Sequence, residues 1–239
     1  KKKLDETITT QPAMLTAAVA TWRVWINVGG PPPAVMAGHS LGEYSALVAA
    51  GAMEFGPALQ LVCQRAALMQ AAVPAGEGAM AAILGLDDQV VLEVCNLAAK
   101  HGVAEAVNFN SPGQVVVAGT RVAIEKVTAL AKEAGARRAL MLPVSVPAHS
   151  SLMQSAGAML EDSLDRVHIE EPEIAVLCAV DGIPYSGIED IRIRMKQQIF
   201  RPVRWVDTIS QMVSAGVTSV VECGPGKVLT GLVRRIDRS

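Results

Sequence analysis

Residues 34–50 read AVMAGHSLGEYSALVAA, and this stretch indicates the fold class. Its first four residues, Ala34 to Ala37, are apolar and predict a short strand, whereas Leu41 to Ala50 predict a helix that ends at Gly51. The segment Gly38-His39-Ser40-Leu41-Gly42 connects the two as a tight turn. A strand that passes through a glycine-flanked turn into a helix is typical of an α/β protein.

Segments typical of helices and strands alternate along the rest of the chain, which supports the α/β class. The first predicted helix ends at two glycines that are followed by three prolines, and Pro57 suits the first position of the helix predicted over residues 57–73. Outside the middle third, we predict helices over residues 12–28, 57–73, 149–167, 188–200, 206–215 and 227–236, and strands over residues 174–180 and 218–223.

The middle third of the chain follows a pattern of its own. Its predicted elements run in the order β-α-β-β-α-β, which is typical of a split ferredoxin-like unit. The strands are expected at residues 79–84, 103–108, 114–118 and 138–144, with a turn at 110–113, and the helices at 88–100 and 122–134. We therefore predict a small ferredoxin-like subdomain of residues 76–144, inserted into a larger α/β subdomain of residues 1–75 and 145–239.

The composition excludes several classes of protein. The 239 residues include 21 Lys or Arg and 23 Asp or Glu, so a net charge of −2 provides no global attraction to nucleic acid. An aromatic content of 3% is low for a base-stacking surface. No apolar stretch reaches the roughly 18 residues that cross a bilayer, and no signal-peptide region follows the polar start. We expect a cytoplasmic protein that binds neither nucleic acid nor membrane.

The four cysteines argue against metal or disulfide chemistry. None of them forms a C-x-x-C pair, and no histidine lies at zinc-ligand spacing from any of them. They are Cys63, Cys95, Cys178 and Cys223. We expect reduced, mostly buried thiols, with no metal and no bound cofactor.

Ser40 is the candidate nucleophile. The turn fits G-x-S-x-G, and a strand before it with a helix after it is the context that a nucleophile elbow requires. The turn projects the Ser40 hydroxyl, and Gly38 and Gly42 leave room where a Cβ would clash. The N–H of Leu41, at the helix N-terminus, can donate to a developing oxyanion. The alternative is a turn in which glycine serves only steric needs, and the strand-and-helix context favours the catalytic interpretation.

A serine nucleophile needs a base, and four histidines are candidates. His39 adjoins Ser40, but neighbouring side chains diverge in such a turn, so we expect it to pack. His101 is expected in a solvent-exposed loop, and His168 on the surface. His149 follows an apolar run and is expected to begin a helix, whose N-terminus would lower its pKa and favour the neutral form. A helix-capping surface role for His149 is the alternative.

Arg65 lies on the apolar side of its predicted helix. A guanidinium in such a place is costly unless it finds acceptors. Two interpretations remain open: an internal salt bridge with an Asp or Glu elsewhere in the chain, or a bidentate site for a substrate carboxylate beside Ser40. The apolar residues three or four positions away are Leu61, Val62, Leu68 and Met69.

An ordered set of motifs runs through nearly the whole chain. The motifs are Gln11-Pro12-Ala13, the turn extended to Glu43, Gln64-Arg65 with Met69-Gln70, residues 76–81, residues 108–114, Val144 to His149, Gln198, Pro202 to Trp205, and residues 222–229. With these motifs the sequence resembles bacterial malonyl-CoA:acyl carrier protein transacylases and, more distantly, the acyltransferase domains of fatty-acid and polyketide synthases.

The resemblance implies a role for each candidate residue. Ser40 would carry the acyl group, and His149 would be its base. Arg65 would bind the free carboxylate of the malonyl group. The backbone carbonyl of Gln198 would orient His149 in place of the usual Asp, and the Leu41 N–H would be one oxyanion donor.

The resemblance also implies the reaction and the partners. A malonyl group would pass from malonyl-CoA through a malonyl-serine ester to the phosphopantetheine thiol of acyl carrier protein, in fatty-acid biosynthesis. The fold would be an α/β-hydrolase-like large subdomain with a ferredoxin-like insert, and the protein a monomer that needs no cofactor. Acyl carrier proteins are acidic, so candidate contacts are Arg137, Arg138, Arg201 and Arg204. The alternatives are a serine thioesterase or hydrolase and a non-catalytic module that binds acyl carrier protein.

Three features depart from the family pattern. The family opens with a segment of G-Q-G-S-Q type that supplies a second oxyanion donor, and the sequence given does not contain it. The expectation is therefore a fragment or a protein without that donor, whose loss typically costs roughly a hundred- to thousand-fold in rate. An Asn that is usual near the positions of Cys178 and Ala179 is missing. Ala148 precedes His149 at a position that varies in the family.

Overall fold

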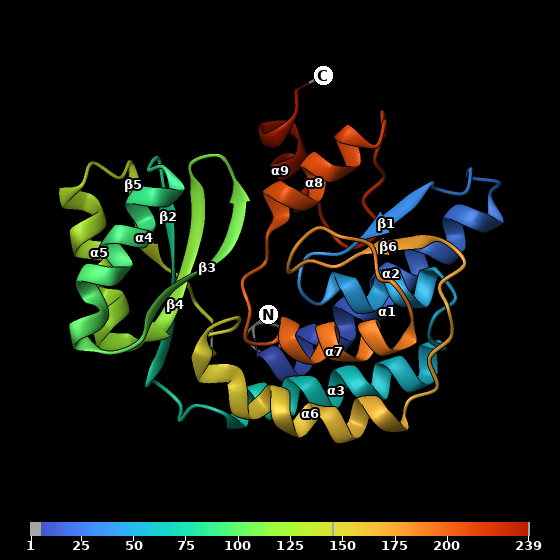
Figure 1. Cartoon of the computed structure of the whole chain (residues 1–239), viewed down its shortest axis with the longest axis horizontal. Helices are drawn as coiled ribbons and strands as arrows, with labels where there is room; N and C mark the ends of the chain where they lie inside the picture. The colour runs from blue at the N-terminus through green and yellow to red at the C-terminus, as the bar shows by residue number, and fades with distance from the viewer. Residues whose placement is uncertain (1–5, 145, 239) are drawn as a thin grey trace.

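The structure is a computed structural model that describes residues 6–144 and 146–238, and it is a mixed α/β protein. The polar start of the chain, Ser145 of the motif before His149, and the outer limits of the predicted large subdomain therefore lie outside the described residues. A helix-rich part that holds a short parallel sheet lies beside a four-stranded antiparallel sheet with two helices on its outer face (Figure 1).

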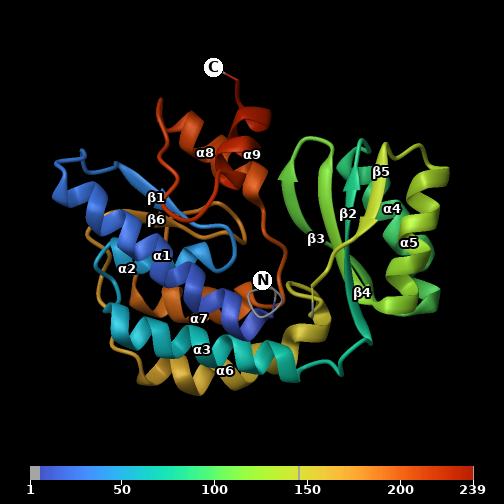
Figure 2. The same cartoon turned by 180° about the vertical axis from the view of Figure 1, so that it is seen from behind.

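The helix-rich part is built around the turn of residues 38–42. Its core is apolar, with Leu15, Tyr44 and Leu61 at most 1% exposed. Helices α1 and α3 lie side by side on the reverse of the molecule (Figure 2). The elements are α1 (Thr7–Asn27), β1 (Val35–Ala37), α2 (Gly42–Ala49), α3 (Phe55–Ala71), η3 (Ser151–Met153), α6 (Gln154–Arg166), β6 (Ala175–Leu177) and α7 (Ile188–Gln198). Strand β1 pairs in parallel with β6, with Met36 opposite Val176.

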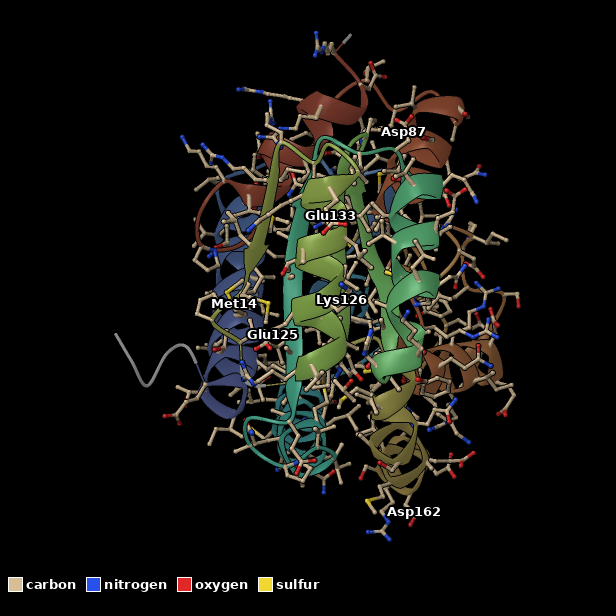
Figure 3. The ribbon with its side chains drawn as sticks, turned by 90° about the vertical axis from the view of Figure 1, so that its left-hand side faces the viewer. Met14, Asp87, Glu125, Lys126, Glu133 and Asp162 are labelled. Carbon is tan, nitrogen blue, oxygen red and sulfur yellow. The ribbon has the colours of Figure 1, made fainter. Side chains whose placement is uncertain are left out.

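The second sheet has the strand order β3-β4-β2-β5, and every neighbouring pair is antiparallel. Helices α4 and α5 cover its outer face, and Glu125 and Glu133 lie on the solvent side of α5 (Figure 3). The inner face packs toward the helix-rich part through Met80 and Val107. The elements are β2 (Gly78–Leu84), α4 (Asp88–Ala98), η2 (Ala99–His101), β3 (Ala104–Ser111), β4 (Gln114–Thr120), α5 (Arg121–Glu133) and β5 (Arg138–Met141).

One extended segment joins the two parts. The Val203 N–H donates to the Val107 carbonyl at 2.8 Å, and the Phe109 N–H donates to the Val203 carbonyl at 2.9 Å. The next residue, Arg204, donates its N–H to the Ala179 carbonyl beyond β6 at 2.7 Å. This backbone therefore ties β3 to the short parallel sheet, and helices α8 (Trp205–Ser214) and α9 (Val228–Ile236) follow it.

The structure differs from the sequence-based expectation in several places, and helix α3 begins at Phe55, so Pro57 is not its first residue. Helix α1 begins at Thr7, so Pro12 lies inside it. The strand expected over residues 218–223 does not form, because no described strand pairs with this segment and Val221 is 55% exposed. The helix expected to begin at His149 begins only at Ser151. The turn expected over residues 110–113 is shorter, since β3 continues to Ser111.

Candidate active site

The turn of residues 38–42 holds Ser40, the candidate nucleophile, in a left-handed conformation with φ 53°. The close approach of the backbone explains the first glycine: a Cβ on Gly38 would lie 1.9 Å from the carbonyl carbon of Gly42. Ser40 lies just before α2, and its hydroxyl contacts His149 and Arg65 rather than the helix backbone. Within the described residues the Leu41 N–H has no backbone acceptor, and it lies where the helix dipole favours negative charge.

Ser40 and His149 form a hydrogen-bonded pair although 109 residues separate them. The Ser40 Oγ lies 2.7 Å from His149 Nε2, and His149 Nδ1 lies 2.8 Å from the Gln198 carbonyl oxygen. A carbonyl oxygen only accepts, so Nδ1 carries the proton and Nε2 presents its lone pair to the hydroxyl. The His149 backbone is itself left-handed, with φ 65°, and its N–H donates to the Ile199 carbonyl.

The environment of His149 keeps its ring neutral. Burial is the main cause that lowers the pKa of His149 to about 3, and the Arg65 guanidinium lowers it further, whereas the bond to Gln198 opposes both. The expected cause, a helix N-terminus, is wrong because the helix begins two residues later at Ser151. The neutral ring is nevertheless the form that accepts a proton.

Arg65 is 1% exposed and reaches the nucleophile from α3. One terminal nitrogen donates to Gln11 Oε1 at 2.5 Å, and the other donates to Gln198 Oε1 at 3.0 Å and lies 3.4 Å from Ser40 Oγ. The guanidinium also lies 5.5 Å from the centre of the Tyr44 ring. Its buried Nε has no partner within the described part of the chain.

The ion pair that the sequence left open for Arg65 is not present among the described residues. The partners of the guanidinium are neutral amides, a hydroxyl and an aromatic ring. A buried cation with neutral partners beside a candidate nucleophile is well placed to bind a carboxylate on the acyl group.

Sequence reasoning gave no role to two residues that the structure places here. Gln11 is 6% exposed on α1 and accepts from Arg65. Glu43 is 0% exposed in the first turn of α2 and accepts from Gln198 Nε2 at 2.6 Å. Its spacing from Ala46 and Leu47 places it on the buried face of α2, which is the signal that could have found it.

The other three histidines lie away from the nucleophile. His39 turns to the second sheet, where its Nε2 lies 2.8 Å from Asn110 Oδ1 and its ring meets Trp205 edge-on at 5.6 Å. His101 is exposed at the end of η2, and His168 is exposed beside Glu170. Of the four candidates, the structure therefore brings His149 alone to Ser40.

No group of three or more His, Cys, Asp or Glu among the described residues has the spacing of a metal site. Of the cysteines, Cys95 and Cys178 are buried, whereas Cys63 is exposed. Helices long and apolar enough to span a bilayer are absent from residues 6–144 and 146–238.

Comparison with known proteins places the chain in a family. Residues 1–239 match the acyl transferase domain. The chain belongs to the acyl transferase family. It is 50% identical over 235 residues to the malonyl CoA-acyl carrier protein transacylase of Escherichia coli strain K12, which covers 98% of this chain and 76% of that protein. The Bacillus subtilis transacylase of the same name is 42% identical over 238 residues, 99% of this chain and 75% of that protein.

Solved structures of this acyl transferase family have the same fold. The malonyl CoA-acyl carrier protein transacylase of Coxiella burnetii superposes with a TM-score of 0.98 at 45% identity, covering 100% of this chain and 75% of that one. A malonyl-transacylase solved in complex with a type II polyketide synthase acyl-carrier protein superposes with a TM-score of 0.97 at 47% identity, covering 99% of this chain and 77% of that one.

Proposed function

We propose that the protein transfers a malonyl group from malonyl-CoA to the phosphopantetheine thiol of acyl carrier protein, in fatty-acid biosynthesis. The observation that carries this proposal is the arrangement of three side chains: the Ser40–His149 pair at 2.7 Å, with the buried Arg65 guanidinium 3.4 Å from the same hydroxyl. The relatives that share this fold are named for the same transfer.

The first half of the reaction loads the serine. His149 Nε2 takes the Ser40 proton as the oxygen attacks the malonyl thioester carbon, and the Leu41 N–H stabilises the oxyanion. The tetrahedral intermediate then collapses: the carbon–sulfur bond breaks, and coenzyme A leaves with the proton from His149. A malonyl ester on Ser40 remains.

The second half of the reaction unloads the serine. His149 takes the proton of the phosphopantetheine thiol, the sulfur attacks the ester carbon, and Ser40 recovers its proton as the bond to its oxygen breaks. The neutral carbonyl of Gln198 orients His149 in both halves. It stabilises the imidazolium less than a carboxylate would.

Arg65 supplies the preference for malonyl over uncharged acyl groups. The free carboxylate of malonyl offers the guanidinium an anionic acceptor that its neutral protein partners do not provide. An acetyl group in the same place would leave the buried charge without that acceptor, and a site built around a polar group discriminates strongly against an analogue that lacks it.

We also propose that acyl carrier protein meets an arginine-rich surface beside the second sheet. Arg137 and Arg138 are exposed, and with Leu84 and Arg235 they line a hollow of about 420 Å³. Arg204 is a weaker candidate, because it pairs with Asp207 at 2.6 Å and stacks on Phe109. Arg201 is exposed and remains a candidate.

The strand order supports the description of residues 76–144 as a ferredoxin-like unit. In a ferredoxin-like unit, two β-α-β halves interlock so that each crossover spans a strand of the other half. The order β3-β4-β2-β5 has this property. We therefore propose that residues 76–144 form a ferredoxin-like insert in an α/β-hydrolase-like large subdomain.

Intact-mass measurement after mixing with malonyl-CoA tests the proposed function. We expect an adduct of one malonyl group that persists, maps to Ser40, and moves to the thiol of added acyl carrier protein that carries phosphopantetheine. The Ser40→Ala variant should carry no adduct. Rapid release of free malonate would indicate a hydrolase, and an absent adduct on the unaltered protein would indicate a non-catalytic module.

A further inference from the structure

Glu43 is a buried carboxylate that no step of the proposed reaction uses. It lies in the first turn of α2 and is 0% exposed. It accepts hydrogen bonds from the Tyr185 hydroxyl, from the Ala179 N–H at 3.2 Å and from Gln198 Nε2 at 2.6 Å. Burial raises the pKa of Glu43, and the hydrogen bonds from Tyr185, Gln198 and Ala179 oppose that rise.

The carboxylate determines which way the Gln198 amide faces. Gln198 Nε2 donates to Glu43 Oε2 at 2.6 Å and to the Ser40 carbonyl at 2.7 Å. Both of these groups are acceptors, so the NH₂ of the amide must lie on their side. The oxygen, Oε1, is thereby turned toward Arg65, from which it accepts at 3.0 Å.

Gln198 contacts all three groups of the proposed mechanism. Its side chain binds the Ser40 carbonyl and the Arg65 guanidinium, and its own backbone carbonyl binds His149 Nδ1 at 2.8 Å. A rotation of the side-chain amide would therefore break its bonds to the Ser40 carbonyl and to Arg65 together, whereas the bond of the backbone carbonyl to His149 does not depend on that amide. Glu43 accepts a hydrogen bond from the Nε2 of this amide, a contact that such a rotation would break.

The placement of Glu43 also suits the charge of Arg65. Burial lowers the pKa of Arg65, whereas the nearby Tyr44 and Glu43 raise it. The carboxylate is separated from the guanidinium by the Gln198 amide, so it compensates the charge without occupying the nitrogens that face Ser40. A direct ion pair would compete with the substrate carboxylate for those donors.

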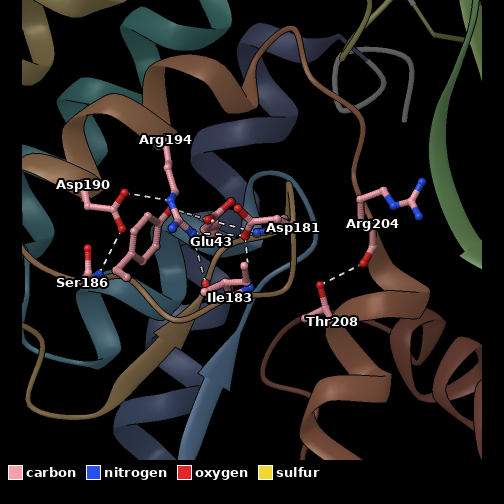
Figure 4. Close-up of polar contacts among 10 residues, drawn as sticks. Glu43, Asp181, Ile183, Ser186, Asp190, Arg194, Arg204 and Thr208 are labelled. Carbon is pink, nitrogen blue, oxygen red and sulfur yellow. Dashed lines mark hydrogen bonds and ion pairs between the residues drawn. The ribbon is translucent and has the colours of Figure 1, made fainter.

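The donor on the far side of Glu43 is held in place. The Tyr185 ring lies 5.7 Å from the Arg194 guanidinium, which is paired with Asp190 at 2.8 Å and with Asp181 at 3.1 Å (Figure 4). The hydroxyl is thus aimed at Glu43 from a fixed ring. The carboxylate is fixed between this donor and Gln198.

We propose that Glu43 is a positioning residue for acyl transfer: through the Gln198 amide it sets the geometry of Arg65 at the Ser40 turn, and so contributes to the preference for a malonyl group. This inference rests on the proposed malonyl transfer. Glu43 does not touch the Ser40 hydroxyl, so it acts only through Gln198.

The test compares Glu43→Gln with the unaltered protein in serine acylation, with malonyl-CoA and acetyl-CoA as donors. A Gln at this position carries no charge and presents an NH₂ that competes with that of Gln198. We expect acylation by malonyl-CoA to fall about ten- to hundred-fold, mainly in kcat. The loss with acetyl-CoA should be smaller, so the ratio of the acylation rate with malonyl-CoA to that with acetyl-CoA should decrease.

Two further variants keep the test decisive. Tyr185→Phe removes one donor and retains the carboxylate, and should shift the same ratio in the same direction by a smaller factor. Glu222→Gln is the matched control, since Glu222 also accepts backbone N–H groups but caps α9, and it should leave the ratio unchanged. If Glu43→Gln does not fold, the result with Tyr185→Phe decides.

The possible outcomes distinguish a failure of this inference from a failure of the proposed malonyl transfer. No malonyl adduct on the unaltered protein would overturn the proposed transfer. A normal adduct, with an unchanged malonyl-to-acetyl ratio in folded Glu43→Gln and Tyr185→Phe, would overturn the positioning role alone. Rates that fall equally for both donors, in proportion to lost folded protein, would also count against it.

Discussion

His149 has a pKa that makes the stability of the protein sensitive to acid. The folded pKa is about 3 and the ordinary value is 6.5, so between these values the unfolded chain binds a proton that the folded chain does not. Stability from this group is complete above pH 6.5 and falls as the pH decreases toward 3. The expected slope is at most about 1.4 kcal/mol per pH unit.

The variant His149→Asn should remove this slope. Asn tolerates the left-handed backbone, φ 65°, and does not titrate. Denaturant unfolding between pH 3 and 7 should show that the unaltered protein loses its stability advantage from His149, so its free energy of unfolding falls relative to that of the variant as the pH decreases. Parallel curves would mean that the ring is not buried in its neutral form.

Arg65 should control which acyl group is accepted. Removing the guanidinium in Arg65→Ala takes away a charge-assisted bond to the malonyl carboxylate, which costs about 1.5–3 kcal/mol, or roughly ten- to hundred-fold in rate. Transfer of acetyl should fall much less. Competition between malonyl-CoA and acetyl-CoA, followed by mass spectrometry of the acyl-serine, measures the ratio. Equal losses for the two donors would contradict the proposed role.

At the scale of the element, the turn between β1 and α2 depends on one glycine more than on the other. A Cβ on Gly38 would lie 1.9 Å from one backbone atom and 2.1 Å from another, whereas a Cβ on Gly42 would meet nothing within 4 Å. We expect Gly38→Ala to lower the free energy of unfolding by about 1–3 kcal/mol and to displace Ser40, with loss of acylation.

Gly42→Ala is the control for that change. Gly42 begins α2, where alanine favours the helix, so stability should stay the same or rise by up to about 1 kcal/mol. Urea unfolding and the rate of serine acylation measure both effects. Similar losses in the two variants would show that the G-x-S-x-G turn is sensitive to any substitution rather than to backbone contact at Gly38.

At the scale of the whole molecule, recognition of the carrier protein should be separable from chemistry. Reversing the charge in Arg138→Glu should raise the KM for acyl carrier protein several-fold, and the effect should shrink at high salt because charge attraction is screened. Loading from malonyl-CoA should not change. Arg166→Glu, the same charge change in the last turn of α6, is the control. An identical KM for both variants would place the docking surface elsewhere.

Most of the elements follow from short-range patterns in the chain. The period-3.6 apolar stripe of α3 predicts that Arg65 lies on the core side, and it is 1% exposed. The turn around Ser40 follows from Gly38, where the backbone of residues 42 and 43 leaves no room for a Cβ, whereas the space expected to be needed at Gly42 is open. These features depend on residues within four or five positions of one another, so their physical causes are visible in the sequence.

Long-range contacts determine the remaining features of the fold and of the candidate site, and no local sequence pattern predicts those contacts. Residues 218–223 have the composition of a strand but no described strand to pair with, since a strand needs a neighbour to satisfy its backbone. The pair Ser40 and His149 spans 109 residues, and the bond from Gln198 to the Ser40 carbonyl spans 158. The roles of Glu43 and Gln11 arise only from burial around one guanidinium, because folding brings α1, α2, α3 and α7 together there.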